Sequence, residues 1–293
     1  MTDTQSRNEG WATREGRRLH WTVTGSGEHT VLLEAGIGAS SSAWRLVEEP
    51  LTAFARVLTY DRAGYGTATV KSTSVEDALL DLETVLEQSA TTGPLVLVGH
   101  SWGGVLMRLF CARHPERAAA LLLVDATHEG MSIMRSPAFN LALKIAARVQ
   151  ALKARSGALR RSLEAGRGEL GRTLTTLPPA LREELLDELS TPATWHQSAH
   201  ELRCVPLSLR SLPTETPHDI PVIAVIGTQA VGGAERRARA AIRTAYETWL
   251  PTVPHGRLLQ APHSGHVVPL QEPELLVRTL RDLLATPPGD AGS

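Results

Sequence analysis

The sequence predicts an α/β fold in which helices cover both faces of a mostly parallel sheet. Short apolar runs alternate along the chain with segments of helical periodicity, and this alternation is typical of such a fold. One stretch, 129–218, breaks the alternation with helical patterns and contains no strand-like run. Because about a dozen residues are enough to connect two parallel strands, this stretch indicates an inserted helical unit.

The predicted elements follow in order along the chain. The candidate strands are 18–24, 29–35, 56–60, 95–100, 120–125, 221–227 and 256–261. The first of them could be doubled into a hairpin, which would make eight strands. Helical periodicity marks 75–90, 103–114, 234–249 and 273–285. Within the insertion, the residues with helical spacing are Leu141, Ile145, Val149 and Leu152, followed by Leu181, Leu185, Leu186 and Leu189.

Composition and charge exclude several classes of protein. The formal net charge is −1, and the arginines are interspersed with acidic residues, so no nucleic-acid partner is expected. The polar start of the chain has no secretory signal, and no apolar run is long enough to span a bilayer. Cys111 and Cys204 do not make a disulfide framework. We therefore expect a cytoplasmic protein with no membrane partner.

The strongest signal for function is a G-x-S-x-G motif at 99–103. It follows the apolar run 95–98 and precedes a helical pattern, so its context is strand, tight turn and helix. Such a turn needs glycines because it leaves no room for side chains beside it, and it exposes the serine hydroxyl at the tip of the strand. Ser101 is therefore the candidate nucleophile of a nucleophile elbow.

A nucleophilic serine needs a general base, and the base needs an acid that orients it. His266 lies on a loop after the last predicted strand. Asp125 ends the apolar run 120–124 and satisfies the chain order serine, acid, histidine. Glu235 remains open as an alternative acid, although a glutamate at the start of a helix is also explained by the helix dipole.

With these residues in place, the chain resembles the α/β-hydrolase superfamily in its serine-esterase branch. The segment 32–38, followed by Trp44, is similar to the strand and oxyanion loop of that family, and 60–66 is similar to its D-x-x-G-x-G turn. The resemblance implies an oxyanion hole formed by the backbone N–H groups of Ile37 and Trp102. Where the family usually has His-Gly in the oxyanion loop, this chain has Ala35-Gly36, so another group must brace the loop.

The resemblance also implies an eight-stranded α/β-hydrolase sheet with a helical cap after the sixth strand. The core would comprise 1–128 and 219–293, and the cap 129–218. Met131, Met134, Phe139 and Trp195 could line a substrate pocket beneath the cap, with packing inside the cap as the alternative for each. His196 and His200 stand four residues apart, as metal ligands can, but no third ligand is evident and we expect no metal.

Together these features predict a cofactor-independent serine hydrolase that cleaves a small or medium carboxylic ester, lactone or thioester. A serine at the elbow argues against epoxide hydrolases and haloalkane dehalogenases, which use an aspartate there. Two alternatives stay open because fold and triad do not fix the substrate. One is a lyase or cyclase acting on a natural-product-like substrate, and the other is a non-catalytic ligand-binding homologue. The expected partner is a small-molecule substrate, bound by a monomer or homodimer.

Overall fold

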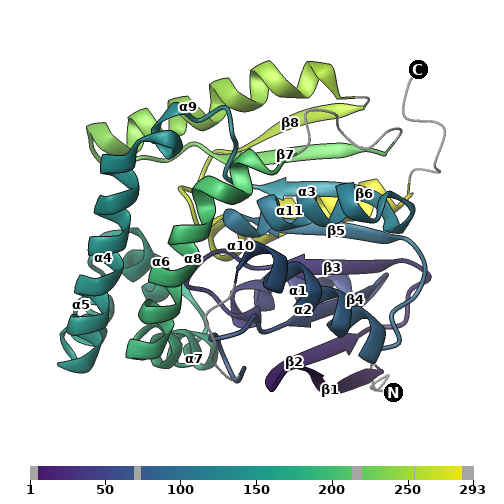
Figure 1. Ribbon diagram of the computed structural model, residues 1–293, viewed down its shortest axis with the longest axis horizontal. Helices are drawn as coiled ribbons and strands as arrows, with labels where there is room; N and C mark the ends of the chain where they lie inside the picture. Colours follow the sequence, from purple (N-terminus) through teal and green to yellow (C-terminus); the bar gives the residue numbers. More distant parts are fainter. Residues whose placement is uncertain (1–5, 69–73, 213–219, 254, 286–293) are drawn as a thin grey trace.

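The computed structural model describes residues 6–68, 74–212, 220–253 and 255–285, and its centre is an eight-stranded sheet (Figure 1). The strand order is β1-β2-β4-β3-β5-β6-β7-β8. The strands are β1 Arg7–Arg14, β2 Arg17–Thr24, β3 Thr30–Glu34, β4 Arg56–Tyr60, β5 Leu95–His100, β6 Ala118–Val124, β7 Val222–Gly227 and β8 Gly256–Ala261. The six strands from β4 to β8 in this order pair in parallel. At the other edge, β1 pairs antiparallel with β2, and β2 pairs antiparallel with β4. The predicted mostly parallel α/β sheet is confirmed.

The first predicted strand is doubled into a hairpin. β1 and β2 pair from Arg7 opposite Thr24 to Arg14 opposite Arg17. The two residues between them, Glu15 and Gly16, both have positive φ, at 48° and 75°. Such a conformation is typical of two-residue hairpin loops, whose twist matches that of the strands. This hairpin supplies the eighth strand of the sheet.

Two apolar layers lie on the two faces of the sheet. Neighbouring residues of β3 alternate between the layers, with Leu32 in one and Val31 and Leu33 in the other. The first layer is covered by α2 (Val75–Gln88), α3 (Trp102–Arg113) and α9 (Gly233–Trp249), and the second by α1 (Arg45–Leu51) and α11 (Pro273–Ala285). β3, β5 and β7 are buried along their whole length, as strands covered on both faces must be.

Between β6 and β7 the chain forms a series of helices that Figure 1 shows grouped at the left end of the sheet. They are α4 Pro137–Arg155, α5 Ala158–Glu164, α6 Gly168–Thr176, α7 Pro179–Leu189 and α8 Pro192–Arg210. Leucines of α5, α6 and α7 form a small core of their own. We call residues 132–210 the helical insertion; the predicted boundary at 218 lies outside the described residues.

Helix α4 shows that helical spacing does not by itself identify a buried face. Leu141, Ile145 and Leu152 share one face as predicted, but they are 57%, 50% and 65% exposed. The buried side of α4 carries the small residues Ala147 and Ala151 instead. None of the described helices, α4 included, has the length and apolar character that a bilayer crossing requires.

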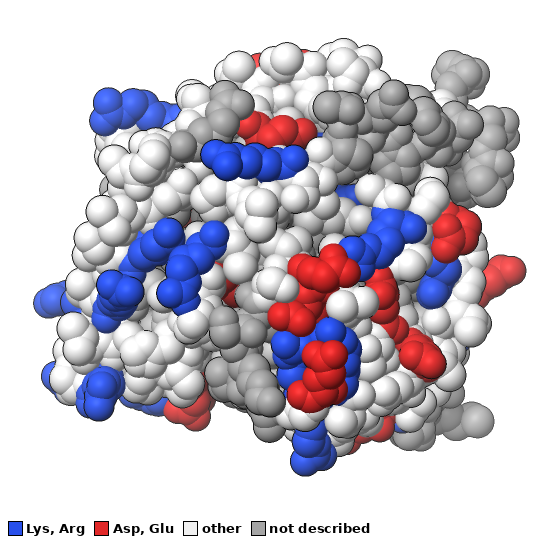
Figure 2. All heavy atoms as spheres, in the orientation of Figure 1, with Lys and Arg blue, Asp and Glu red and all other residues white. Residues whose placement is uncertain are grey.

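Charged side chains are unevenly distributed on the face drawn in Figure 2. Lys and Arg predominate over the insertion at the left, and acidic side chains lie mainly over the right. Helix α4 contributes to this difference, since its charged residues between Pro137 and Arg155 are all basic. The net charge of −1 therefore combines regions of opposite sign.

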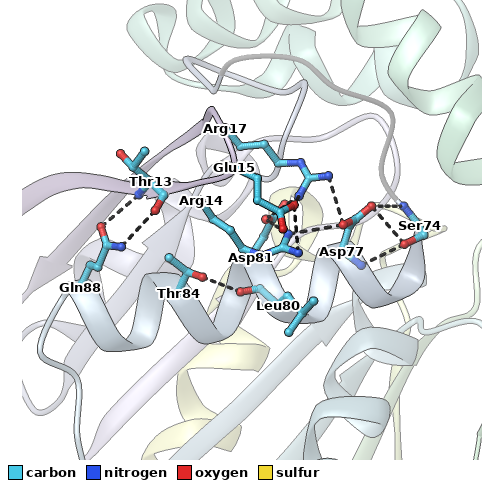
Figure 3. Close-up of polar contacts among 10 residues, drawn as sticks. All are labelled: Thr13, Arg14, Glu15, Arg17, Ser74, Asp77, Leu80, Asp81, Thr84 and Gln88. Atoms are coloured by element: carbon cyan, nitrogen blue, oxygen red, sulfur yellow. Dashed lines mark hydrogen bonds and ion pairs between the residues drawn. The ribbon is translucent and has the colours of Figure 1, made fainter.

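The antiparallel edge is anchored to α2 by a group of ion pairs (Figure 3). Asp81, which is 2% exposed, accepts from Arg14 Nη1 at 3.1 Å and from Arg17 Nη1 at 3.4 Å. Asp77 lies 3.1 Å from Arg17 and also forms a capping box with Ser74 at the start of α2. These contacts fix the hairpin and do not involve the predicted catalytic residues.

Candidate active site

Ser101 lies at the turn between β5 and α3 in a strained backbone conformation. Its φ is 55° and its ψ is −123°, a region that residues other than glycine rarely occupy. Hydrogen bonds hold this conformation: the Ser101 N–H donates to the Val124 carbonyl at 3.1 Å, and the Thr127 N–H donates to the Ser101 carbonyl at 3.0 Å. The turn is therefore tied to the end of β6, the neighbouring strand.

The glycines around Ser101 are required by close backbone approaches. A Cβ atom at Gly99 would lie 2.5 Å from the Gly104 backbone, and one at Gly103 would lie 2.5 Å from the Ala35 carbonyl oxygen. At Gly104 it would lie 2.3 Å from the Ala126 methyl group. The structure thus agrees with the steric reason that the motif itself suggests.

The structure brings His266 and Asp125 together, although 141 residues separate them. His266 Nδ1 lies 2.6 Å from Asp125 Oδ2. The second oxygen of Asp125 accepts from the Gly227 N–H at 3.0 Å and from Arg239 at 2.5 Å. Burial by itself raises the pKa of Asp125, but its contacts with His266 and Arg239 outweigh that effect and lower the pKa. This carboxylate therefore stays ionised at neutral pH.

Glu235, the alternative acid, has a different position. It is exposed in the first turn of α9, where its carboxylate accepts from the backbone N–H of Val231 at 2.5 Å. Arg239, one helical turn further along α9, is the residue of this helix that reaches the predicted triad. Sequence reasoning missed Arg239, because α9 carries several arginines and only its packing decides which one faces inward.

The predicted oxyanion loop lies directly against Ser101. A Cβ atom at Gly36 would be 3.0 Å from Ser101 Cβ and 3.1 Å from His100 Nδ1. Ile37, the next residue, shares a cavity with Ser101. Trp102 begins α3, and the first N–H groups of a helix have no partner within it. Of the two residues predicted as oxyanion donors, Trp102 therefore follows Ser101 in the chain, and Ile37 lies on the loop packed against it.

Arg62 holds this loop where the family usually has a histidine. Its guanidinium donates to the carbonyl oxygens of Ala35 at 2.5 Å and Gly36 at 2.8 Å. Arg62 is 4% exposed, and the carboxylates of Glu34 and Glu201 balance its charge. Sequence reasoning left the bracing group open; the arginine sits in the family-like turn 60–66, but nothing in the sequence indicates where its side chain points.

His100, the residue before Ser101, contacts the predicted base. Its Nε2 lies 2.8 Å from the His266 carbonyl oxygen, and the two rings are 4.8 Å apart. Burial, together with the nearby His266, lowers the pKa of His100 to about 3. A neutral His100 therefore donates its Nε2 proton to this carbonyl and helps to fix the loop that carries His266.

A cavity of about 280 Å³ opens at Ser101 and His266. Its other lining residues come from the oxyanion loop, from the loop after His266 and from the insertion; the insertion contributes Glu169, Leu170, Leu185, Glu188, Leu189 and Trp195. Apart from the two glutamates, those insertion residues are apolar. The leucine spacing of 181–189 was the sequence signal for part of this wall.

Of the four residues predicted to line the pocket, Trp195 does so. Met131 is buried in the apolar layer beneath α2, α3 and α9, and Met134 packs against the same layer. Phe139 is half-buried in the first turn of α4 and is not among the residues that line the cavity. Those three positions follow β6 closely in sequence, and the chain there packs against the core before it turns toward the cavity.

The residues considered for metal binding lie elsewhere. His196 and His200 lie on α8, where His200 contacts Arg203, a group that would repel a cation. Among the residues that the structure describes, no group of three or more His, Cys, Asp or Glu side chains is placed to hold a metal ion.

The eight-stranded sheet and the serine on its strand-to-helix turn define an α/β-hydrolase fold. The sequence model described as "Alpha/beta hydrolase family" matches residues 31–279, and the chain belongs to this family.

The individual proteins to which the chain is similar include an esterase and an epoxide hydrolase. The chain is 26% identical over 111 residues to the pimeloyl-[acyl-carrier protein] methyl ester esterase of Yersinia enterocolitica, over 38% of this chain and 42% of that protein. It is 35% identical over 114 residues to bifunctional epoxide hydrolase 2 of Sus scrofa, over 37% and 20%. The chain thus spans less than half the length of the curated relatives it matches.

Among solved structures, the Cif epoxide hydrolase from Acinetobacter nosocomialis superposes with a TM-score of 0.76 at 17% identity. The match covers 95% of this chain and 89% of that one. At this identity the likeness establishes a shared fold.

Proposed function

We propose that this protein is a serine hydrolase that cleaves a small or medium carboxylic ester, lactone or thioester through an acyl-enzyme intermediate. One observation carries the proposal: Ser101, on its strained turn, lines the same cavity as His266, and Nδ1 of His266 is bonded to the buried carboxylate of Asp125. A nucleophile, a base and an orienting acid in this relation are the parts of a serine-hydrolase triad.

Each group has a defined role in the proposed reaction. Ser101 Oγ attacks the acyl carbon while Nε2 of His266 accepts its proton, and the same proton then goes to the leaving alcohol or thiol. Asp125 keeps the Nδ1 proton in place and stabilises the charged imidazole. The N–H groups of Ile37 and Trp102 stabilise the oxyanion, and one such donor typically contributes ~10²–10³ in rate. A water activated by His266 then releases the acid.

The cavity supports an uncharged substrate. Its lining includes the carboxylates of Glu169 and Glu188, and none of the described lining residues is Lys or Arg. An anionic acyl group would therefore meet repulsion without a compensating cation. The leucines and Trp195 of the insertion support its proposed role as a cap that selects the acyl chain. The proposed steps use the chain's own groups and no cofactor.

The residue at the elbow separates this proposal from epoxide hydrolysis, the activity in the names of several similar proteins. Epoxide hydrolases of this superfamily use an aspartate as nucleophile, and this chain has Ser101 at that position. An acyl group transferred to Ser101 forms an ester, and His266 can activate the water that hydrolyses it. A serine nucleophile therefore favours ester, lactone or thioester substrates.

Covalent labelling and ester turnover test the proposal together. A fluorophosphonate probe should add one mass increment to the intact protein, and uncharged p-nitrophenyl esters should be hydrolysed. Ser101→Ala and His266→Ala should each abolish both signals while circular dichroism stays native, because triad members act as a unit.

Three other outcomes would reject the proposal. Labelling without hydrolysis of any ester would favour the lyase or cyclase alternative. A protein that neither reacts with the probe nor turns over an ester would favour the ligand-binding alternative. Full turnover by the Ser101→Ala enzyme would show that another nucleophile operates.

A further inference from the structure

Helix α8 of the insertion carries a stripe of buried polar side chains. Thr194, Ser198, Glu201 and Ser208 are spaced as on one face of the helix and are 6%, 2%, 1% and 0% exposed. Polar groups are found at such positions when they have hydrogen-bond partners. The partners of this stripe include the loops around Ser101.

Glu201 is the central residue of the stripe. Its carboxylate accepts from Arg62 at 3.0 Å and 3.1 Å and from the Tyr65 hydroxyl at 2.7 Å. The same guanidinium donates to the carbonyl oxygens of Ala35 and Gly36. Because Arg62 and Glu201 are both almost fully buried, this chain of charged hydrogen bonds links α8 to the oxyanion loop without intervening solvent.

Two further contacts connect the stripe to the residues beside Ser101. The Trp102 indole donates to Ser208 Oγ at 3.1 Å. A Cβ atom at Gly38 would lie 3.3 Å from Ser198 Oγ, so the oxyanion loop also packs closely on α8. Both backbone segments that carry the proposed oxyanion donors are thus in contact with the insertion.

Helix α6 of the insertion makes an equivalent contact with the loop that carries the base. Glu169 Oε1 accepts from the backbone N–H groups of His266 at 2.6 Å and Val267 at 3.2 Å. Gly265 permits this approach, since a Cβ atom there would lie 2.3 Å from the same oxygen. Gln271, on α10 (Val268–Gln271), donates to Thr173 of α6 at 2.8 Å.

We infer that the helical insertion is a structural part of the catalytic machinery, with Glu201 and Glu169 as positioning residues. Glu201 acts through Arg62 on the oxyanion loop, and Glu169 acts on the backbone of His266. This inference rests on the proposed serine-hydrolase function. It differs from the role of a cap that only shapes the pocket, because such a cap would leave the rate of acylation unchanged once a substrate is bound.

Single-turnover kinetics, with the enzyme in excess over one uncharged p-nitrophenyl ester, test the inference. Complete labelling by the fluorophosphonate probe counts the functional sites, so a partly unfolded variant does not distort the result, and the dependence of the single-turnover rate on enzyme concentration gives the acylation rate constant and the substrate Kd. The variants are Glu201→Gln, Arg62→Lys, Glu169→Ala and Glu169→Gln. Glu184→Gln is the matched control, since Glu184 of α7 pairs with Arg45 of the core, 3.0 Å away, and touches neither catalytic loop.

We expect Glu201→Gln and Arg62→Lys to lower the acylation rate constant per site by ~10²-fold, because small displacements of reacting groups and oxyanion donors have effects of that size. Kd should change by less than about threefold, since the cavity wall is intact. Glu169→Ala should lower the same rate constant, and Glu169→Gln should restore it, because an amide oxygen can still accept from the two N–H groups. Glu184→Gln should match the wild type.

The inference is overturned if all of the Glu201, Arg62 and Glu169 variants acylate at the wild-type rate per site, or if Kd alone changes. If the two variants around Arg62 do not fold, the comparison of Glu169→Ala with Glu169→Gln decides the outcome. Failure of the proposed function has a different signature, since then the wild type itself neither takes up the probe nor releases p-nitrophenol, or Ser101→Ala still does so.

Discussion

At the scale of single residues, Asp125 is the group on which the proposed triad depends most sharply. One oxygen of its carboxylate is hydrogen-bonded to Nδ1 of His266, and the other accepts a hydrogen bond from Arg239. The carboxylate of Glu235 accepts a hydrogen bond from the backbone N–H of Val231 instead. Asp125→Asn should lower kcat on an activated ester by ~10⁴, because loss of the orienting acid leaves the histidine in the wrong tautomer. Glu235→Gln should leave kcat near the wild-type value.

The measurement is kcat for both variants on one ester, with native circular dichroism as the control. Arg239→Gln adds a useful comparison, since it removes the second partner of Asp125 and keeps the carboxylate. A near-normal Asp125→Asn enzyme beside an inactive Glu235→Gln enzyme would reverse the proposed assignment.

The lowered pKa values of two buried histidines predict how the free energy of unfolding depends on pH. Burial lowers the pKa of His100 to about 3 and that of His128 to about 4, from an ordinary value of 6.5. Below pH 6.5 the unfolded chain takes up protons that the folded protein does not, so the free energy of unfolding falls as the pH decreases toward these values. We therefore expect the contribution of these two histidines to stability to be constant between about pH 7 and 8 and to decline steadily between about pH 6.5 and 4.

Urea denaturation at several pH values checks this expectation. His128→Asn should make the decline shallower, because asparagine has no group that titrates in this range and its side-chain oxygen can accept the Gly130 N–H that His128 Nδ1 accepts now. The difference in the free energy of unfolding between the wild type and His128→Asn at pH 8, where both histidines are neutral, gives the effect of the substitution itself. Equal declines for the two proteins would exclude His128 as a source of the acid sensitivity.

At the scale of elements, the ion pairs between the hairpin and α2 are expected to contribute to stability and not to activity. Asp81→Ala leaves Arg14 and Arg17 with Asp77 and the exposed Glu15 as their remaining shared partners. We expect it to lower the free energy of unfolding by about 2–3 kcal/mol, less than the ~3–5 kcal/mol typical when a buried pair loses its last partner. Glu9→Ala, which removes an exposed ion pair on the same hairpin, should leave stability unchanged.

Thermal unfolding measures the effect of Asp81→Ala on stability, and ester turnover at 25 °C measures its effect on activity. Asp81→Ala should melt at a lower temperature and retain wild-type kcat in the folded range. Loss of kcat per folded molecule would show that the hairpin edge influences the site, in contradiction to its position in the sheet.

At the scale of the whole molecule, substrate size should depend on the wall that the insertion adds to the cavity. Deleting the insertion would not test this, because Glu169 contacts the loop that carries His266 and Glu201 contacts Arg62, which holds the oxyanion loop. Leu170→Ala should instead favour longer acyl chains and Leu170→Trp shorter ones, with discrimination of ~1–3 kcal/mol per methylene at most.

The readout is kcat/KM across p-nitrophenyl esters of increasing chain length. Met134→Ala is the control, since Met134 packs against the core and does not line the cavity. Identical chain-length profiles for both Leu170 variants and the wild type would remove the insertion from substrate selection.

Features that a few consecutive residues encode could be predicted from the sequence. The buried strands appear as apolar runs, their alternation with helices predicts a mostly parallel α/β sheet, and the turn around Ser101 needs glycines at fixed spacing. The hydrolase fold was implied by the resemblance of the motifs. The positions of His266 and Asp125 after predicted strands, together with the chain order serine, acid, histidine, made these two residues the candidates, and the structure places them in contact. Each of these signals is local, because periodicity and turn sterics act over a few residues.

Contacts between side chains far apart in the sequence could not be predicted from it. Arg62 and Glu201 are 139 residues apart, and Arg239 and Asp125 are 114 apart; their contacts depend on how whole helices pack on the sheet. The same dependence explains why Met131 lies in the core, Met134 packs against it and Leu141 faces solvent, although all three are apolar. A helical pattern fixes which residues share a face, and packing against other elements fixes what that face touches.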